Sequence, residues 1–485
     1  MKTILRTFVG CTAILFGTAC MGAVKYVPEN MKVELSLKVP GNNAVNYKLH
    51  PDKLENSYFD YEWRSDNKLP ITVFHKVEER DSCMRLTVQL TAAQDVYFNY
   101  RQLLSTGYRH DNCQFYMPGF WYRRNLRSPK KAPSFHTSDS WLVREDRLSA
   151  PLTGIFSEKE KRFMTVNRLD DFSMDALATH KEGEIILSGK TSLGFTGFEN
   201  QQGIAMLSFG FPYREAPKSY IRKLTLAPEV EAFQLMKKGE SVLLTWEIME
   251  SGADDFSDFI QHTWEHCYDT YAPKPVENSY SIADMKQVLS CFFVNSLVDN
   301  QPLVYNSGIH LKVSDCERNG QAEVGFIGRV LLNAFNAWEY GWQSNREELK
   351  VNSTKIFDSY LKNGFTQAGF FKESVNFDKG YEEPVHSIRR QSEGIYAMFH
   401  FLAYEKENGR RHPEWEQKLK RILDMFLQLQ NVDGSFPRKF RDDLTIVDPS
   451  GGSTPSATLP LVMGYKYFKD KRYLASSKRT ADYLE

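Results

Sequence analysis

The sequence predicts a chain with two parts, a large β-sandwich followed by an array of helical hairpins. Between about residues 30 and 250, apolar and β-branched side chains recur with the period of two that is typical of strands. From about residue 280 the period changes to the 3.6 of amphipathic helices, and pairs of such helices recur along the chain. The 485 residues are enough for two or three domains.

The first 23 residues have the pattern of a signal peptide. Lys2 and Arg6 supply positive charge, an apolar run follows, and small residues end at Ala19. The apolar run is too short to span a membrane, and no later segment is predicted to do so. We therefore expect residues 1–23 to be removed and the protein to be exported.

Cys20 leaves the final location of the exported chain open. A cysteine directly after the small residues is compatible with a lipid anchor, but a bacterial lipobox normally has Leu or a similar residue where this chain has Gly17. The expected locations are therefore the periplasm, the outer membrane as a lipoprotein, and the extracellular space.

Residues 24–252 are predicted to form the sandwich. Turn signals such as Pro40-Gly41 and Lys238-Gly239 separate its β-rich runs. Trp121 lies beside basic residues in the run MPGFWYRRN. An aromatic side chain next to charges suits sugar stacking and suits a contact between domains equally well. The predicted strands are Val33–Val39, Ile71–Lys76, Met84–Leu90, Val96–Tyr100, Ile185–Ser188, Ala205–Phe211 and Ser241–Ile248.

Residues 253–280 are predicted to be a linker. An amphipathic helix over 254–270 begins with Asp254 and Asp255, which favour the positive end of the helix dipole. The run Tyr271-Ala-Pro-Lys-Pro275 then interrupts the helical pattern, so we place the domain boundary there.

Residues 281–485 are predicted to form helical hairpins. The clearest pair occupies Ser387 to Phe436, and its second helix begins at Pro413, where a first helical residue tolerates a missing N–H. The order of parts repeats in Gln321–Phe371 and in Ser453–Leu484, and repeated helix pairs indicate a stacked or closed array. Long connections precede the pairs and are expected on one face of the array, where function is expected. They span about 300–320, 364–386 and 431–454.

This order of parts resembles the six-hairpin glycosidases, whose catalytic domain is an (α/α)6 toroid. The resemblance covers most of the mature chain, and no catalytic motif of a particular family matches. It implies a substrate pocket at the N-terminal ends of the inner helices, which begin near Gln321, Arg389 and Thr454. It therefore implies Glu323 and Glu393 as rim residues and a glycoside hydrolase that uses carboxylates as general acid and base.

The resemblance also predicts that the toroid is incomplete. Six hairpins at the spacing seen here would need roughly twice the 206 residues from Tyr280 to Glu485. We therefore expect about half a toroid, in a chain that is either truncated or continues beyond Glu485.

Two glutamates are the candidate catalytic residues. Glu393 has Arg389 and Arg390 nearby, which favour a carboxylate acting as a base or a substrate ligand. The same position also suits a carboxylate that only stabilises the start of a helix or pairs with Arg389. Glu323 follows acidic residues in the sequence, which favour a proton and the role of general acid. The candidate substrate-binding residues are Asp315, Arg389, Arg390, Gln391, Asp433, Phe436 and Trp121.

Two other functions fit the same region. A polysaccharide lyase acting on uronic acids needs a neutralised carboxylate and a base, which Arg389, Arg390, Tyr381 and His386 could supply. A secreted carbohydrate-binding or scaffold protein would need no catalyst. The 61 basic and 61 acidic residues do not favour nucleic acid, the scattered cysteines predict no metal site, and no cofactor is expected. The oligomeric state is not predicted.

Overall fold

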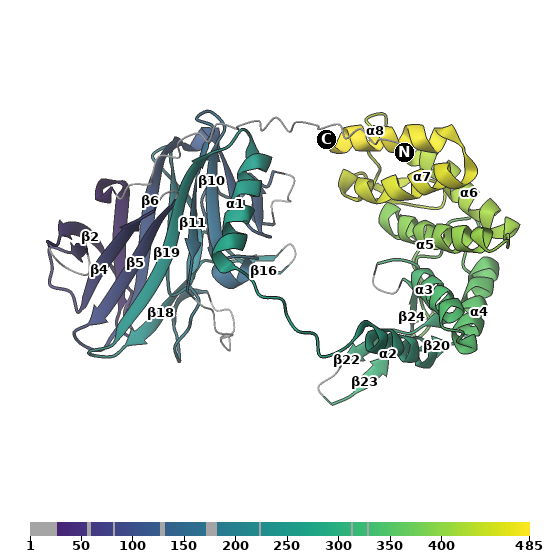
Figure 1. The fold of residues 1–485 in the computed structure, drawn as a ribbon, viewed down its shortest axis with the longest axis horizontal. Coiled ribbons are helices and arrows are strands. Elements are labelled where there is room, and N and C mark those ends of the chain that lie inside the picture. Colours follow the sequence, from purple (N-terminus) through teal and green to yellow (C-terminus); the bar gives the residue numbers. More distant parts are fainter. Residues whose placement is uncertain are drawn as a thin grey trace, which may run out of the picture. The chain divides into compact units, whose positions relative to one another are not determined.

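The computed structural model divides the chain into two units, Met1–Lys274 and Pro275–Glu485 (Figure 1). It describes residues 27–485 apart from segments 56–59, 81–82, 127–130, 171–181, 223–224, 312–313 and 327–328. The predicted signal peptide and Cys20 lie outside the described residues. No helix in the described part of the chain is long and apolar enough to cross a membrane.

The first unit is a large, mainly antiparallel β structure, as the period-two pattern predicted. One layer contains β6 at its centre, paired with β1 on one side and with β14 and β18 on the other. A second layer runs through β4, β5, β19, β11, β10 and β7 in that order. The strands are β1 (Met31–Lys38), β2 (Val45–Lys53), β3 (Tyr61–Arg64), β4 (Ile71–Glu79), β5 (Cys83–Ala92), β6 (Val96–Arg109), β7 (Cys113–Met117), β8 (Trp121–Arg123), β9 (Trp141–Arg144), β10 (Leu152–Ser157), β11 (Arg162–Arg168), β12 (Gly183–Ile186), β13 (Phe195–Gln201), β14 (Ile204–Phe211), β15 (Arg214–Glu215), β16 (Ser219–Arg222), β17 (Thr225–Ala227), β18 (Val230–Met236) and β19 (Ser241–Gly252).

Trp121 lies in the core of this unit, so the prediction that it binds substrate is wrong. Its side chain is fully buried, and its ring packs against Phe198 with centroids 5.1 Å apart. The indole N–H donates to the backbone oxygen of Arg123 at 2.9 Å. Because side chains alternate along a strand, β8 places the neighbouring Tyr122 on the exposed side instead.

Helix α1 (Phe256–Tyr271) packs on the β structure of the same unit. The Asp255 side chain caps it by accepting from the backbone N–H groups of Ser257 and Asp258. Phe259 is fully buried, and its ring lies 2.6 Å from where a Cβ on Gly154 would be. A side chain at position 154 would therefore push the helix off the sheet.

The segment after α1 should be the first site of proteolysis. Residues 272–281 form no helix or strand and are exposed along their whole length. Because a protease needs an accessible and locally extended chain, limited digestion is expected to cut here and release two resistant fragments. Gel electrophoresis with mass spectrometry checks this, and early cuts inside β6 or β19 would contradict it.

The second unit consists of helices joined by connections that carry short strands. Helix α5 packs between α3 and α7, and α3 and α7 each pack against the helix that follows them, α4 and α8. Pro413 is the first residue of α6, as predicted. The helices are α2 (Ile282–Asn295), α3 (Val330–Gln343), α4 (Glu347–Asn363), α5 (Ile388–Glu407), α6 (Pro413–Leu429), α7 (Thr454–Phe468) and α8 (Lys471–Leu484). The strands are β20 (Leu297–Val298), β21 (Tyr305–Asn306), β22 (Ile309–Leu311), β23 (Cys316–Arg318), β24 (Gln321–Glu323), β25 (Ser374–Asn376), β26 (Tyr381–Glu382), β27 (His386–Ser387), β28 (Lys439–Phe440) and β29 (Ile446–Asp448).

The helix expected to open at Glu323 begins later, at Val330. Glu323 instead ends β24, which pairs with β25. The backbone of Phe326 and of Arg329 has a positive φ, 67° and 44°, which interrupts any helix between the strand and α3. The apolar pattern of α3 is helical as predicted, and its predicted start was wrong by about two turns.

Candidate functional site

The candidate site lies at the N-terminal end of α5. The Ser387 side chain caps this helix by accepting from the backbone N–H of Arg390 at 3.1 Å. The segment after β24 lies directly on the first turn, since a Cβ on Gly325 would stand 2.9 Å from the Arg390 Cα atom. A glycine is needed there because any side chain would lift the segment away from the helix.

The Glu393 carboxylate contacts both α5 and the segment that precedes α3. Its Oε1 accepts from Arg389 Nε at 3.0 Å. Its Oε2 accepts from the backbone N–H of Phe326 and lies 3.6 Å from Arg329 Nε. Both carboxylate oxygens therefore have partners, and two of the partners come from the segment that precedes α3.

Three arginines contact Phe326, two of them at its exposed ring and one at its backbone. The guanidinium carbons of Arg389 and Arg390 lie 5.0 and 5.6 Å from the centre of the Phe326 ring, within the range of cation–π contact. Arg329 Nε donates to the backbone oxygen of Phe326 at 3.0 Å. Phe326 is 42% exposed. We call Arg329, Arg389, Arg390 and Phe326 the arginine cluster, and such forked cations suit a planar anion.

Glu323 lies next to this cluster and is less exposed than Glu393. Its Oε1 accepts from Gln321 Nε2 at 3.3 Å and lies 3.7 Å from Arg390 Nη2. Arg390 thus contacts Glu323 while its neighbour Arg389 binds Glu393. The two predicted catalytic glutamates therefore lie at the same end of α5, and their catalytic roles stay a prediction.

Glu373 is a buried carboxyl group that sequence reasoning missed. Its Oε1 accepts from the backbone N–H of Ser387 at 2.6 Å and from Gln391 Nε2 at 3.0 Å. Its Oε2 has no hydrogen-bond partner. Burial raises the pKa of Glu373 to about 8, although the two donors and Arg390 act in the opposite direction. The one feature of the sequence that could have indicated this burial is the position of Glu373 two residues after the aromatic pair Phe370-Phe371.

Gln391 supports the site from inside and does not face a ligand. Its side chain is fully buried. The side-chain amide accepts from the backbone N–H of Phe371 at 3.0 Å and donates to the backbone oxygen of the same residue at 2.8 Å. The prediction that Gln391 binds substrate is therefore wrong, because its buried amide forms hydrogen bonds between α5 and the segment before β25.

His386 links Glu373 to the third long connection. Its Nε2 lies 2.7 Å from Asp442 Oδ1, and its Nδ1 lies 3.9 Å from Glu373 Oε1. The ring packs between Phe370 and Phe440, with centroids 5.1 and 5.5 Å away. Because His386 is only 1% exposed, it is not accessible as the base that the lyase hypothesis assigned to it.

The remaining predicted ligands make local contacts. Asp433 accepts from the backbone N–H of Ser435 at 3.0 Å, and hydrogen bonds from Ser435 lower the pKa of Asp433. Asp315 accepts from the backbone N–H of Cys316 at 2.7 Å. Phe436 is fully buried, so its predicted contact with substrate is wrong. Asp433 and Asp315 are exposed, and their binding roles stay predictions.

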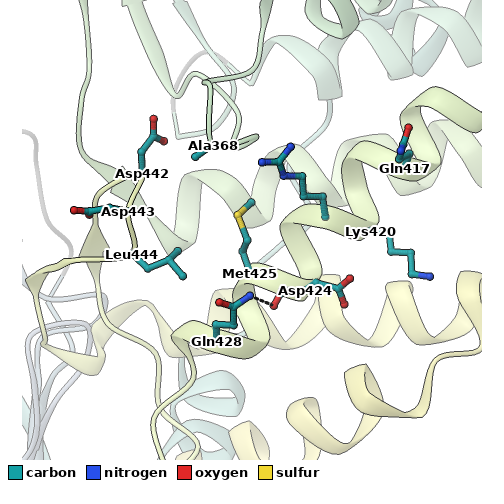
Figure 2. A pocket seen from close by; sticks show the side chains of 10 residues that line it. Ala368, Gln417, Lys420, Asp424, Met425, Gln428, Asp442, Asp443 and Leu444 are labelled. Atoms are coloured by element: carbon teal, nitrogen blue, oxygen red, sulfur yellow. Dashed lines mark hydrogen bonds between the residues drawn. The ribbon is translucent and has the colours of Figure 1, made fainter.

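A cavity of about 620 Å³ opens beside Asp442. Figure 2 shows Asp442, Asp443 and Leu444 on one side of it, with Met425 and Gln428 of α6 facing them. Glu373, His386 and Asp442 lie in a row, and Asp442 is the member of the row that reaches solvent. Among the described residues, no three His, Cys, Asp or Glu side chains gather as a metal site would require.

No protein-family model matches the chain. Parts of the chain align with solved structures of carbohydrate-active enzymes, at low sequence identity and with TM-scores below 0.5. A cellobiose 2-epimerase from Bacillus thermoamylovorans matches with 19% identity and a TM-score of 0.28, over 32% of this chain and 39% of that enzyme. An unsaturated glucuronyl hydrolase from Bacillus sp. GL1 matches with 15% identity and a TM-score of 0.32, over 42% of this chain and 57% of the hydrolase.

A polysaccharide lyase matches over a larger share, 94% of this chain and 75% of the lyase, with 11% identity and a TM-score of 0.34. By contrast, the chain spans less than two thirds of the length of the epimerase and of the glucuronyl hydrolase. Similarity of this degree assigns no activity, so the functional proposal rests on the side chains of the site.

Proposed function

We propose that this chain is an exported carbohydrate-active protein of the glycoside hydrolase class, acting on a sugar that carries a carboxylate. The single observation that supports this is the arginine cluster at the N-terminal end of α5, with its exposed Phe326 ring. We further propose that the helical hairpins belong to an (α/α)6-type toroid, whose substrate side would be this end of the helices.

The cluster has the chemistry to bind a uronic acid. A guanidinium group donates two parallel N–H bonds to a carboxylate, and the face of an aromatic ring packs against the C–H groups of a sugar. Glu393 holds Arg389, and with it Arg329, in place before any ligand arrives. Side chains that are already ordered lose less conformational entropy when a ligand binds, and the affinity is therefore higher.

Hydrolysis of a glycosidic bond needs a protonated carboxyl group and a second carboxylate. We assign the acid to Glu323, whose side chain is 11% exposed, and the base or ligand role to Glu393, whose side chain is 22% exposed. Both adjoin the arginine cluster, so a sugar bound there would lie between groups of the required type.

A polysaccharide lyase is the second candidate because the same arginines could neutralise a uronate carboxylate. That reaction also needs a base near the sugar C5 proton. His386 is buried. Partial desolvation together with the neighbouring Glu383 raises the pKa of the exposed Tyr381, which disfavours its basic form. The residues suggested for the lyase thus supply the cation but no suitable base, which favours hydrolysis.

The test of this function is an Arg389→Ala variant. We expect it to weaken binding of a uronic-acid oligosaccharide by about tenfold or more, since a charge-assisted pair is lost. Calorimetry measures binding. Assays for new reducing ends and for ultraviolet-absorbing unsaturated products separate a hydrolase, a lyase and a binding protein without turnover.

Arg438→Ala is the matched control for this variant. Its side chain is 48% exposed, against 47% for Arg389, and it too pairs with a carboxylate, that of Asp448. Equal losses from both variants would show that only general charge matters, and wild-type protein that does not bind uronates would overturn the proposal.

A further inference from the structure

A groove runs along α4 near the C-terminal end of α5, away from the arginine cluster. Two cavities of about 460 Å³ each share the lining residues Trp338, Thr354 and Asp358, and so form one continuous depression. Glu405, which also lines it, lies twelve residues after Glu393 on α5, or about 18 Å along the helix axis. The groove is therefore a separate site.

The floor of the groove is aromatic and rigid. Its accessible aromatic side chains are Trp338, which is partly exposed, and Trp342, which is 44% exposed, both of α3. Phe357 of α4 and Phe401 of α5 also line it but are only 3% exposed. The Trp338 indole N–H donates to Glu405 Oε1 at 3.1 Å. Glu405 is itself buried and is also bonded to Arg410 and to His412, so the indole ring is fixed in one orientation.

Carboxylates outnumber the lysine and arginine side chains in the lining of the groove, with Glu347, Asp358, Glu405 and Glu414 against Lys350, Lys355 and Arg411. Arg411 binds Glu416 at 2.9 Å and Lys350 binds Glu347 at 2.5 Å. Lys355 lies 3.3 Å from a carboxylate oxygen outside the groove, that of Asp299.

Two carboxylates at the rim differ from these. Asp358 and Glu414 are exposed, line the groove, and have no ion-pair partner within the described residues. An unpaired carboxylate accepts hydrogen bonds from hydroxyl groups and repels an anion.

We propose that this groove is a second carbohydrate-binding site, which takes an uncharged oligosaccharide. The indole rings of Trp338 and Trp342 suit the C–H faces of sugar rings. Asp358, Glu414 and Thr354 suit the hydroxyl groups of the sugar. The two unpaired carboxylates repel the carboxylate of a uronic acid, which is the sugar proposed for the arginine cluster. The two ends of α5 would thus bind an uncharged sugar and an anionic sugar, and the proposal for the groove itself does not depend on the proposed hydrolase activity.

The test measures binding of four uncharged hexasaccharides, cellohexaose, laminarihexaose, mannohexaose and xylohexaose, to the full chain. We expect at least one of them to bind and to change the tryptophan fluorescence. Asp358→Ala should weaken that binding by about tenfold or more, because a charged hydrogen-bond acceptor is removed. Asp443→Ala, an exposed aspartate of the other cavity, is the matched control and should leave binding unchanged.

Two further measurements distinguish binding at the groove from binding at the arginine cluster. Arg389→Ala should leave binding of the uncharged sugar unchanged, and a hexauronate should not compete for the groove. Failure of all four sugars to bind, equal binding by Asp358→Ala and wild type, or loss of binding in Arg389→Ala would each overturn the proposal.

Discussion

Replacing Glu323 with Gln is expected to lower turnover of a uronic-acid substrate by about a hundredfold or more, the usual scale for losing a general acid. The amide cannot deliver a proton to the leaving oxygen, although it has nearly the shape of the carboxyl group. Gln at position 323 can still accept from Gln321 Nε2, so the end of β24 should keep its structure. Steady-state kinetics and circular dichroism of the variant measure the two effects separately.

Glu382→Gln is the control for this experiment. Glu382 lies in β26 of the same small sheet, is exposed, and pairs with Lys372 at 3.1 Å. It should keep wild-type turnover because it does not contact the arginine cluster. If Glu323→Gln keeps full activity, or loses activity only together with its helical signal, Glu323 is not the acid.

The helices could be predicted because their apolar residues recur at helical spacing over several turns. Ile395, Met398, Phe399 and Leu402 are all buried in α5, as their spacing predicted. The start of α3 could not be found in this way. It depends on the backbone of Phe326 and Arg329, whose positive φ angles accompany contacts with α5 that no local pattern reports.

Apart from Glu323, which the resemblance placed at the same rim as Glu393, the candidate site was predicted only where its residues are neighbours in the sequence. Arg389, Arg390 and Glu393 occupy one turn of α5, so helical spacing placed them together. Phe326 and Arg329 join them from a segment at least 60 residues earlier, which a single sequence does not reveal.

Burial explains the other errors. Trp121 was expected to bind sugar because charged residues flank it, and Phe436 was a second aromatic candidate, but both are fully buried. Position beside a charge does not determine which face of a strand or loop carries the ring. Glu373 was overlooked for the opposite reason, since acidic side chains are rarely buried and a loop carboxylate is assumed to be solvated.

Replacing Glu373 with Gln is expected to change how stability depends on pH. Burial raises the pKa of this carboxyl to about 8 in the folded protein, against an ordinary value near 4.5. The folded state therefore binds more protons than the unfolded state between these pH values. Stability from this group is complete below about pH 4.5, declines as the pH rises, and is lost beyond about pH 8, at about 1.4 kcal/mol per pH unit.

Gln cannot ionise, so Glu373→Gln should resemble the wild type at pH 5 and exceed its melting temperature by several degrees at pH 8.5. The Gln side chain keeps an oxygen for the N–H groups of Ser387 and Gln391, which preserves the packing at the start of α5. Thermal unfolding followed by circular dichroism at 222 nm, in steps between pH 5 and 9, measures the difference. The surface variant Glu382→Gln should show no such trend. A constant offset between Glu373→Gln and wild type across this range would mean that Glu373 is already ionised in the folded protein, because only a proton held by the native carboxyl makes the two curves diverge.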